Sequence, residues 1–312
     1  MILRKVFNPI TVIKYLKTEL LVSAILSSLV YISYVTLGMH KVSLPFSIAA
    51  ILGSALAIFI AFRNQSSYAR WWEARTLWGG IVNSSRVFAR LVRTFTNSHK
   101  NQPNFDKERS EKFKKETIYM QIAWIHALRL HLRKENNWDI LKNFISSEDY
   151  NKLMKASNKP NYLQTLIGER IYEAMENGTL GGFDSFQIEG QLLALANYQG
   201  GCERIKNTPL LRQYHFFTKL FLSVFMFILP FSLIGDFVKM EIGFLVIPVS
   251  VLISFVFATM AKVGEVNEEP FENRITDVPL TAICNTIERD LLETLDIEDL
   301  PKKLEPENGF LF

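Results

Sequence analysis

The sequence contains little cysteine and none of the short motifs that identify common enzymes. Cys202 and Cys284 are its only two cysteines, and their separation fits no metal-ligand spacing. A GxSxG elbow, an HExxH zinc motif and a CxxC pair are all absent from the 312 residues. With no candidate nucleophile or base, we predict that the protein is not an enzyme, and its two thiols fit a reduced cytoplasmic compartment.

Two features resemble ligand sites only in composition. The GTLGG sequence at 178–182 follows no predicted strand and lacks the Lys-Ser or Lys-Thr of a phosphate-binding loop, so we interpret it as a connection between helices. His126 and His131 are five residues apart, which turns them to different faces of a helix and away from a shared metal site. We expect no cofactor and no bound metal.

Charge is nearly absent from four long apolar runs, at residues 20–37, 42–62, 214–235 and 242–261. The first has 18 residues, which at ~1.5 Å per residue reach roughly 27 Å, close to the thickness of the hydrocarbon core of a bilayer. Lys219, near the start of the third run, is the only Lys, Arg, Asp or Glu in the four. These runs predict four transmembrane helices in two hairpins, with Pro230 and Pro248 as kinks.

Lysine and arginine flank the predicted spans on one side, at Lys5, Lys14, Lys17, Arg63, Arg70, Arg75, Arg204, Lys206 and Arg212. Because such residues stay on the cytoplasmic side, we predict a multi-pass protein of the inner (plasma) membrane with both termini in the cytoplasm. The expected domains are an N-terminal segment with the first hairpin (1–62), a helical cytoplasmic domain (63–212), the second hairpin (213–262) and a cytoplasmic C-terminal segment (263–312).

Long period-two alternation, the pattern of a half-buried strand, is missing, whereas several stretches have the period of an amphipathic helix. Helices are predicted at 109–133, 161–176 and 185–198. Gly200 and Gly201 are expected to end the last of these, as glycines often do at helix termini. We therefore predict an all-α, polytopic membrane protein with a helical cytoplasmic domain.

The stretch 45–93 passes from an uncharged apolar segment into an aromatic and basic one without an internal proline, which predicts one helix that leaves the membrane. Within it, Ser54, Ile58 and Phe62 recur four residues apart, a spacing that stacks side chains on one helical face. From spacing alone, this face either lines a passage or contacts lipid and neighbouring helices.

Three tryptophans follow this face in the sequence. Trp71, Trp72 and Trp78 cannot all lie on one side of a helix, and such large aromatic side chains usually need packing partners. We expect some of them in subunit contacts; the alternative is that all three pack within one chain or lie at the membrane interface.

Two classes of membrane protein compete with a passive conduit. A coupled transporter usually carries ionisable side chains near mid-membrane or internally repeated halves, and the first pair of spans does not resemble the second. The pattern favours a conduit or a non-conducting structural protein. Since four spans rarely enclose a water path, a pore requires several copies around an axis.

Three segments, FRNQSSYARWWEARTLWGGIVNSSR at 62–86, GGCERIKNTPL at 200–210 and EEPFENRITDVPL at 268–280, resemble the bacterial branch of the bestrophin family. The resemblance covers nearly the whole chain, with four similarly placed spans. It implies a homopentamer in which five copies of the second span surround a central ion pore that continues through the cytoplasmic domain.

Carried over by position, the hydrophobic neck of the family falls on Ser54, Ile58 and Phe62. Ser54 departs from the bulky apolar residue that is usual there, so the outermost ring is expected to be wider and wetter. The cytoplasmic constriction of the family is assigned to Ile188, because Gln191 follows it at a similar interval. Stacked apolar rings at Ile58 and Phe62 can gate a pore by dewetting.

Eukaryotic bestrophins bind calcium at an acidic clasp just after a Pro-Phe pair. Here Pro270 and Phe271 are followed by ENRITD, which contains Arg274 and no run of acids. The oxygen ligands that calcium prefers are not evident, so we predict no calcium activation through this segment.

Together these observations predict a pentameric channel that passively conducts small monovalent ions, with chloride as the first expectation and sodium as the alternative. A non-conducting membrane scaffold or a transporter is the alternative of another class. The expected partners are further copies of the chain, membrane lipid and small inorganic ions, and not nucleic acid.

Overall fold

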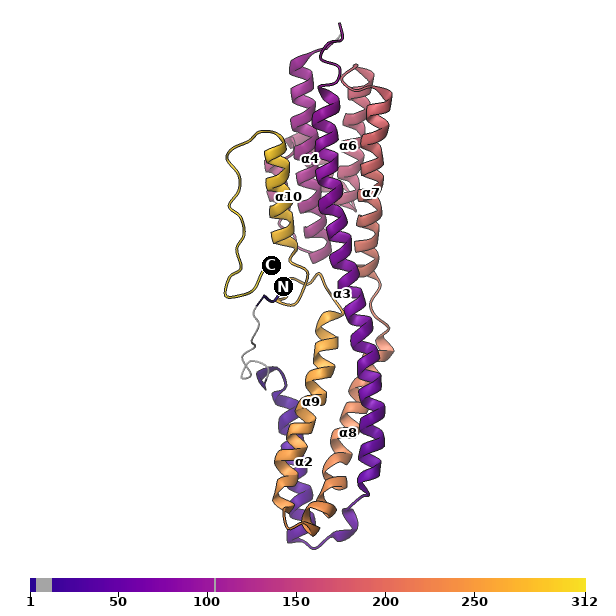
Figure 1. The fold of residues 1–312 in the computed structure, drawn as a ribbon, viewed down its shortest axis with the longest axis vertical. Coiled ribbons are helices and arrows are strands. Elements are labelled where there is room, and N and C mark those ends of the chain that lie inside the picture. Colours follow the sequence, from indigo (N-terminus) through magenta and orange to yellow (C-terminus); the bar gives the residue numbers. More distant parts are fainter. Residues whose placement is uncertain (4–12, 104) are drawn as a thin grey trace. The chain divides into compact units, whose positions relative to one another are not determined.

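The computed structural model describes residues 1–3, 13–103 and 105–312, and it divides into two compact helical units (Figure 1). Unit 1 comprises Met1–Leu3, Trp71–Thr208 and Glu269–Phe312, and unit 2 comprises Arg4–Arg70 and Pro209–Glu268. In the described residues, β-type pairing is limited to the isolated bridges that Phe310 makes with Ile2 and Glu307. The predicted all-α fold is confirmed for this part of the chain. Lys5 lies outside the described residues.

Unit 2 contains the four apolar segments. They are α2 (Lys17–Tyr31) with the π-helical turn η1 (Ile32–Thr36), the first part of α3 (Phe46–Thr96), α8 (Arg212–Lys239) and α9 (Val246–Asn267), with short 3₁₀ turns η2 (His40–Val42) and η4 (Gly243–Leu245). All four are long and apolar enough to cross a membrane, which confirms the predicted spans.

The two prolines of the second hairpin lie at different positions within their helices. Pro230 lies inside α8, where a missing amide hydrogen bond must be accommodated. Pro248 is the third residue of α9, and the first turn of a helix has no intrahelical acceptor for its amides. Proline costs less at this position than inside a helix, and the kinks expected at Pro230 and Pro248 stay predictions.

α2 packs against α9 through small polar and apolar residues (Figure 1). The Ser23 and Ser254 hydroxyl oxygens are 2.9 Å apart, and the Ser27 hydroxyl donates to the Ser23 carbonyl oxygen at 2.7 Å. The buried face of α9 consists of Val246, Ser250, Ser254, Ala258, Ala261 and Gly264. Small side chains let helix backbones approach closely, which is how membrane helices gain packing contacts without a hydrophobic driving force.

Unit 1 is a bundle formed by the second part of α3 with α4 (Lys107–Arg133), α5 (Ser147–Lys155), α6 (Lys159–Glu176), α7 (Gly182–Asn207), α10 (Leu280–Thr294) and the short turn η3 (Trp138–Asn143). Asp106, Ser146 and Asn158 cap the N-termini of α4, α5 and α6, each accepting a backbone amide at 3.1 Å. Trp124 lies in the core and donates to the Gln199 side-chain oxygen at 3.1 Å. The helices predicted at 109–133 and 161–176 are confirmed within two residues.

α7 continues through Gly200 and Gly201 to Asn207, so the prediction that these glycines end the helix is wrong. A Cβ on Gly201 would lie 2.9 Å from the Leu77 methyl groups of α3, and one on Gly80 would lie 2.4 Å from the Tyr198 ring of α7. Glycine is required here for the close approach of two helices rather than for a turn.

The first residues of the chain pair with its C-terminal segment inside unit 1. The Leu3 amide donates to the Gly309 carbonyl oxygen, and the Leu311 amide donates to the Met1 carbonyl oxygen, both at 2.9 Å. Figure 1 draws the two chain ends together beside α10. Residues 1–3 and the C-terminal segment therefore lie on the same side of any membrane that unit 2 spans.

Candidate pore-lining face

The side chains of Ile58 and Phe62 lie on the uncovered face of α3 in unit 2, with 60% and 67% of their surface exposed in the single chain. Ser54 is exposed on the same face. Leu56 and Ile60, by contrast, are at most 2% exposed. The spacing therefore predicted correctly that the three residues share one side of the helix.

Packing on the opposite side of α3 determines which face stays uncovered. Leu56 and Ile60 belong to the apolar core of unit 2, together with Leu222 and Phe225 of α8. A Cβ on Gly53 would lie only 3.0 Å from the Phe225 ring, so the two helices are in close contact there. Rotation of α3 about its axis would break this packing, which fixes Ile58 outward.

The uncovered face carries no charged side chain from Ser54 to Phe62. The Ser54 hydroxyl donates to the Ala50 carbonyl oxygen at 2.8 Å, and the Ser66 hydroxyl donates to the Phe62 carbonyl oxygen at 3.0 Å. With these hydrogens committed to the helix, the two serines present oxygen lone pairs outward. The face is thus apolar with weak acceptors, and any electrostatic preference for anions must come from outside it.

Ile188 does not face a passage, as a residue of the cytoplasmic constriction would. Its side chain is fully buried in the core of unit 1, on the face of α7 that also carries Leu192 and Leu195. A side chain enclosed by its own subunit cannot form a ring around a channel axis, so the structure argues against Ile188 as the cytoplasmic constriction. Phe183 and Phe186, which sequence reasoning missed, are instead 70% and 73% exposed near the start of α7.

The three tryptophans have different surroundings. Trp78 is fully buried in the core of unit 1. Trp71 is partly buried and donates its indole hydrogen to the Thr276 carbonyl oxygen at 3.0 Å, whereas Trp72 is 55% exposed. Packing within one chain therefore accounts for Trp78 and part of Trp71, and the Trp72 ring stacks on that of Trp71 with their centres 6.4 Å apart.

The segment after Pro270 and Phe271 is organised around one carboxylate. Asp277 accepts the backbone amides of Glu272 at 2.7 Å and Arg274 at 3.1 Å. Burial raises the pKa of the Asp277 carboxyl, while the two amide hydrogen bonds act in the opposite direction. Its oxygens are thus engaged by the loop itself, and the described residues contain no cluster of three His, Cys, Asp or Glu side chains that could hold a metal.

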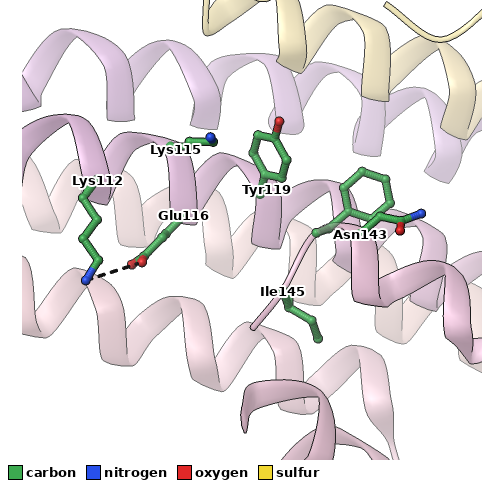
Figure 2. A pocket seen from close by; sticks show the side chains of 7 residues that line it. Lys112, Lys115, Glu116, Tyr119, Asn143 and Ile145 are labelled. Atoms are coloured by element: carbon green, nitrogen blue, oxygen red, sulfur yellow. Dashed lines mark ion pairs between the residues drawn. The ribbon is translucent and has the colours of Figure 1, made fainter. Parts of the chain in front are cut away.

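A hollow with a volume of about 340 Å³ lies in unit 1 beside α4 (Figure 2). Its two lysines are already engaged, since the Lys112 ammonium lies 3.8 Å from Glu116 and the Lys115 ammonium lies 5.7 Å from the centre of the Tyr119 ring. The hollow is open, and its one carboxylate is paired with Lys112, so it identifies no ligand.

The chain belongs to the bestrophin family. Residues 6–293 match the family model for bacterial and fungal bestrophin proteins. A voltage-dependent anion channel-forming protein, YneE of Salmonella typhi, is 33% identical over 303 residues, which cover 96% of this chain and 93% of that protein. YneE of Escherichia coli K12 is 32% identical over 277 residues, covering 89% and 84% of the two chains.

Solved structures agree with this assignment. A crystal structure of a bacterial bestrophin homologue from Klebsiella pneumoniae is 30% identical, with a TM-score of 0.80 over 90% of this chain and 98% of that one. Bestrophins are ion channels and not enzymes, and the four apolar helices make this chain a multi-pass membrane protein.

Proposed function

We propose that five copies of the chain form an anion channel of the inner membrane, with Ser54, Ile58 and Phe62 lining its neck. The observation that carries this proposal is the uncovered apolar face of α3, where two large side chains lie outward on a helix of a channel-family protein. The related proteins named as anion channel-forming support chloride, rather than sodium, as the conducted ion.

The proposed orientation places unit 1 in the cytoplasm. The Lys and Arg residues that flank the spans favour this side, and the pairing of Leu3 with Gly309 keeps both chain ends with unit 1. The functional division is then two membrane hairpins within residues 1–62 and 213–262, and a cytoplasmic part made of residues 63–212 and 263–312 together with residues 1–3.

A neck lined by isoleucine and phenylalanine impedes ions because water leaves a narrow apolar passage. Five copies multiply each substitution, so a small change in one chain becomes a large change in the bore. Ile58 and Phe62 provide the bulk of the apolar wall, whereas Ser54 adds little.

Truncation of the neck tests this role. Ile58→Ala and Phe62→Ala should each raise anion flux into liposomes severalfold, and together raise it further, because the passage becomes wider and easier to wet. Flux is measured per assembled oligomer, beside thermal stability. Ser54→Ala should change flux little, and Leu252→Ala, at a position of α9 that is 61% exposed, controls for lost bulk at another uncovered apolar site.

The opposite result has a clear meaning. If α3 only packs against lipid or helices here, the same truncations leave cavities, which lower stability without raising flux. That outcome in both single variants would exclude Ile58 and Phe62 from a neck, even for a chain that assembles.

Ion selectivity needs a separate measurement. Reversal potentials of purified protein in asymmetric NaCl should move towards the chloride equilibrium potential, since basic flanking residues concentrate anions near the inner mouth. A shift towards the sodium equilibrium potential would overturn the anion proposal and leave the architecture untouched.

A further inference from the structure

A buried charged cluster directly follows Phe62 in unit 2. The Arg63 side chain is only 1% exposed. Its Nε donates to Glu268 Oε1 at 2.8 Å, its Nη2 donates to the same oxygen, and Nη2 also lies 3.0 Å from His215 Nδ1. Three helices meet in this cluster, because Arg63 belongs to α3, His215 to the first turn of α8 and Glu268 to the end of α9.

The donors and acceptors of the hydrogen bonds in this cluster are fixed by the residue types. Arginine can only donate hydrogen bonds, so the His215 Nδ1 atom must be the acceptor, and the proton of the neutral ring is on Nε2. The Glu268 carboxylate neutralises a guanidinium that has little access to water, and an unpaired charge there would be costly. Arg63 is therefore satisfied only when α3 turns it towards α8 and α9.

The neighbouring residue strengthens the same attachment. The Asn64 side-chain amide donates to the Met260 carbonyl oxygen of α9 at 3.0 Å. A Cβ on Gly264 would lie 2.1 Å from the Asn64 side-chain oxygen, so only glycine permits this approach of α3 to α9. Successive residues of a helix are rotated by about 100°, which means that fixing Arg63 and Asn64 also fixes the direction of Phe62.

We propose that the cluster of Arg63, Glu268 and His215 is the positioning element of the neck, which holds Phe62 towards the channel axis and thereby keeps basal ion flux low. The inference rests on the proposed function, since it assigns a purpose to the direction of Phe62. Arg63 acts through its neighbour and does not itself line the passage.

Stability alone does not account for charges at this place. Replacing both members of a buried ion pair with uncharged groups of similar size is often neutral for stability, whereas removing one member leaves the other unpaired and is strongly destabilising. Uncharged side chains in place of Arg63 and Glu268 would no longer require α3 to take one particular rotation about its axis. A change in flux at constant stability therefore distinguishes positioning from support of the fold.

The experiment uses the full-length protein in liposomes and the double variant Arg63→Met with Glu268→Gln. Flux per oligomer should rise by about twofold or more, as for residues that act on a contacting neighbour, while the melting temperature stays near that of the unaltered protein. In a Phe62→Ala background the same pair should have no further effect, because the ring it positions has been removed. Lys262→Met with Glu265→Gln removes a half-exposed ion pair within α9 at 2.9 Å; it is the control for the loss of two opposite charges and should leave flux unchanged.

His215 provides a second route that keeps the ion pair intact. His215→Asn places an acceptor near the position of Nδ1 and should retain low flux, whereas His215→Leu removes the acceptor and should raise it. If the double variant fails to assemble, the comparison of His215→Asn with His215→Leu still tests the positioning role.

Each outcome separates the two proposals. If Phe62→Ala raises flux and neither the double variant nor His215→Leu does, the positioning role is overturned and the neck stands. An increase that persists in the Phe62→Ala background also overturns it, since the cluster then acts elsewhere. If Phe62→Ala leaves flux unchanged, Phe62 is excluded from the neck, and the positioning role is excluded with it.

Discussion

Lys134 ends α4 in a backbone conformation that favours glycine, with φ at 56° and ψ at 33°. Its amide donates to the His131 carbonyl oxygen at 3.2 Å, and the Glu135 amide donates to the Leu130 carbonyl oxygen at 3.0 Å, which closes the last turn. Lys134→Gly should raise the free energy of unfolding by about 1 kcal/mol, because glycine has no Cβ to strain this conformation. Thermal unfolding in detergent measures the change.

Lys134→Ala is the control for this substitution. Alanine removes the lysine side chain and keeps the Cβ, so it should not stabilise the protein. Equal gains for the glycine and alanine variants would mean that the lysine side chain, rather than its backbone, is responsible.

Single residues also show where inference from sequence succeeds and fails. The four-residue spacing of Ser54, Ile58 and Phe62 places them on one side of α3, because a helix returns to the same side at that interval. The spacing does not show whether that side of α3 faces lipid, another helix or a passage. The interval to Gln191 predicts a constriction at Ile188, whereas the i+4 spacing of Ile188 and Leu192 indicates a core-facing position, and both side chains are buried.

At the scale of elements, the paired glycines of α7 offer a comparison within one turn. Gly201→Ala should destabilise the protein by about 1–3 kcal/mol, because its Cβ would meet Leu77 at 2.9 Å and force α3 and α7 apart. Gly200 has no atom within 4 Å of its Cβ position, so Gly200→Ala should be neutral or gain roughly 0.5–1 kcal/mol of helix propensity.

Chemical unfolding of the two variants in detergent measures this difference. If both were destabilised equally, contact with Leu77 would not explain the need for glycine at position 201. A destabilised Gly200→Ala beside a stable Gly201→Ala would indicate that the uncovered side of α7 packs against another copy of the chain.

The helices themselves were predictable because long apolar runs and 3.6-residue periods are local signals. The four spans and α4 follow from such patterns. Helix ends were harder to predict, because a glycine that permits close packing and a glycine that ends a helix look the same in a sequence, as Gly201 illustrates. Contacts between α3 and α7 decide between them, and those are formed by residues more than 100 positions apart.

At the scale of the whole molecule, both units leave large apolar side chains uncovered. α8 exposes Phe216, Phe217, Leu220, Phe221, Val224 and Phe227, which suits contact with lipid or with other membrane helices. Unit 1 exposes Phe183, Phe186 and Leu193, and large apolar side chains exposed outside the membrane usually mark contact surfaces. The number of copies could not be predicted from the residues of one chain, because contacts within a subunit do not fix a symmetry; the family resemblance supplied it.

The assembly prediction is a native mass of about 180 kDa in detergent, five times the 35.9 kDa chain. Native mass measurement checks it, and a monomer or dimer would remove the pore. Mass alone does not say which face of α3 meets the axis. A second measurement is needed for that, and the two native cysteines permit it because both are buried.

Burial raises the pKa of the Cys284 thiol to about 12, so little reactive thiolate is present at neutral pH in the folded protein. Phe62→Cys then introduces one accessible thiol per chain. Identical side chains from neighbouring copies converge only near the axis of a closed ring, so a short bifunctional thiol reagent should link chains of Phe62→Cys and of Ile58→Cys. Leu252→Cys, exposed on α9, is the control that should react without linking chains. Efficient linking at Leu252 but not at Phe62 would place α9, rather than α3, at the axis of the assembly, because only the helix that surrounds the axis brings its own copies together.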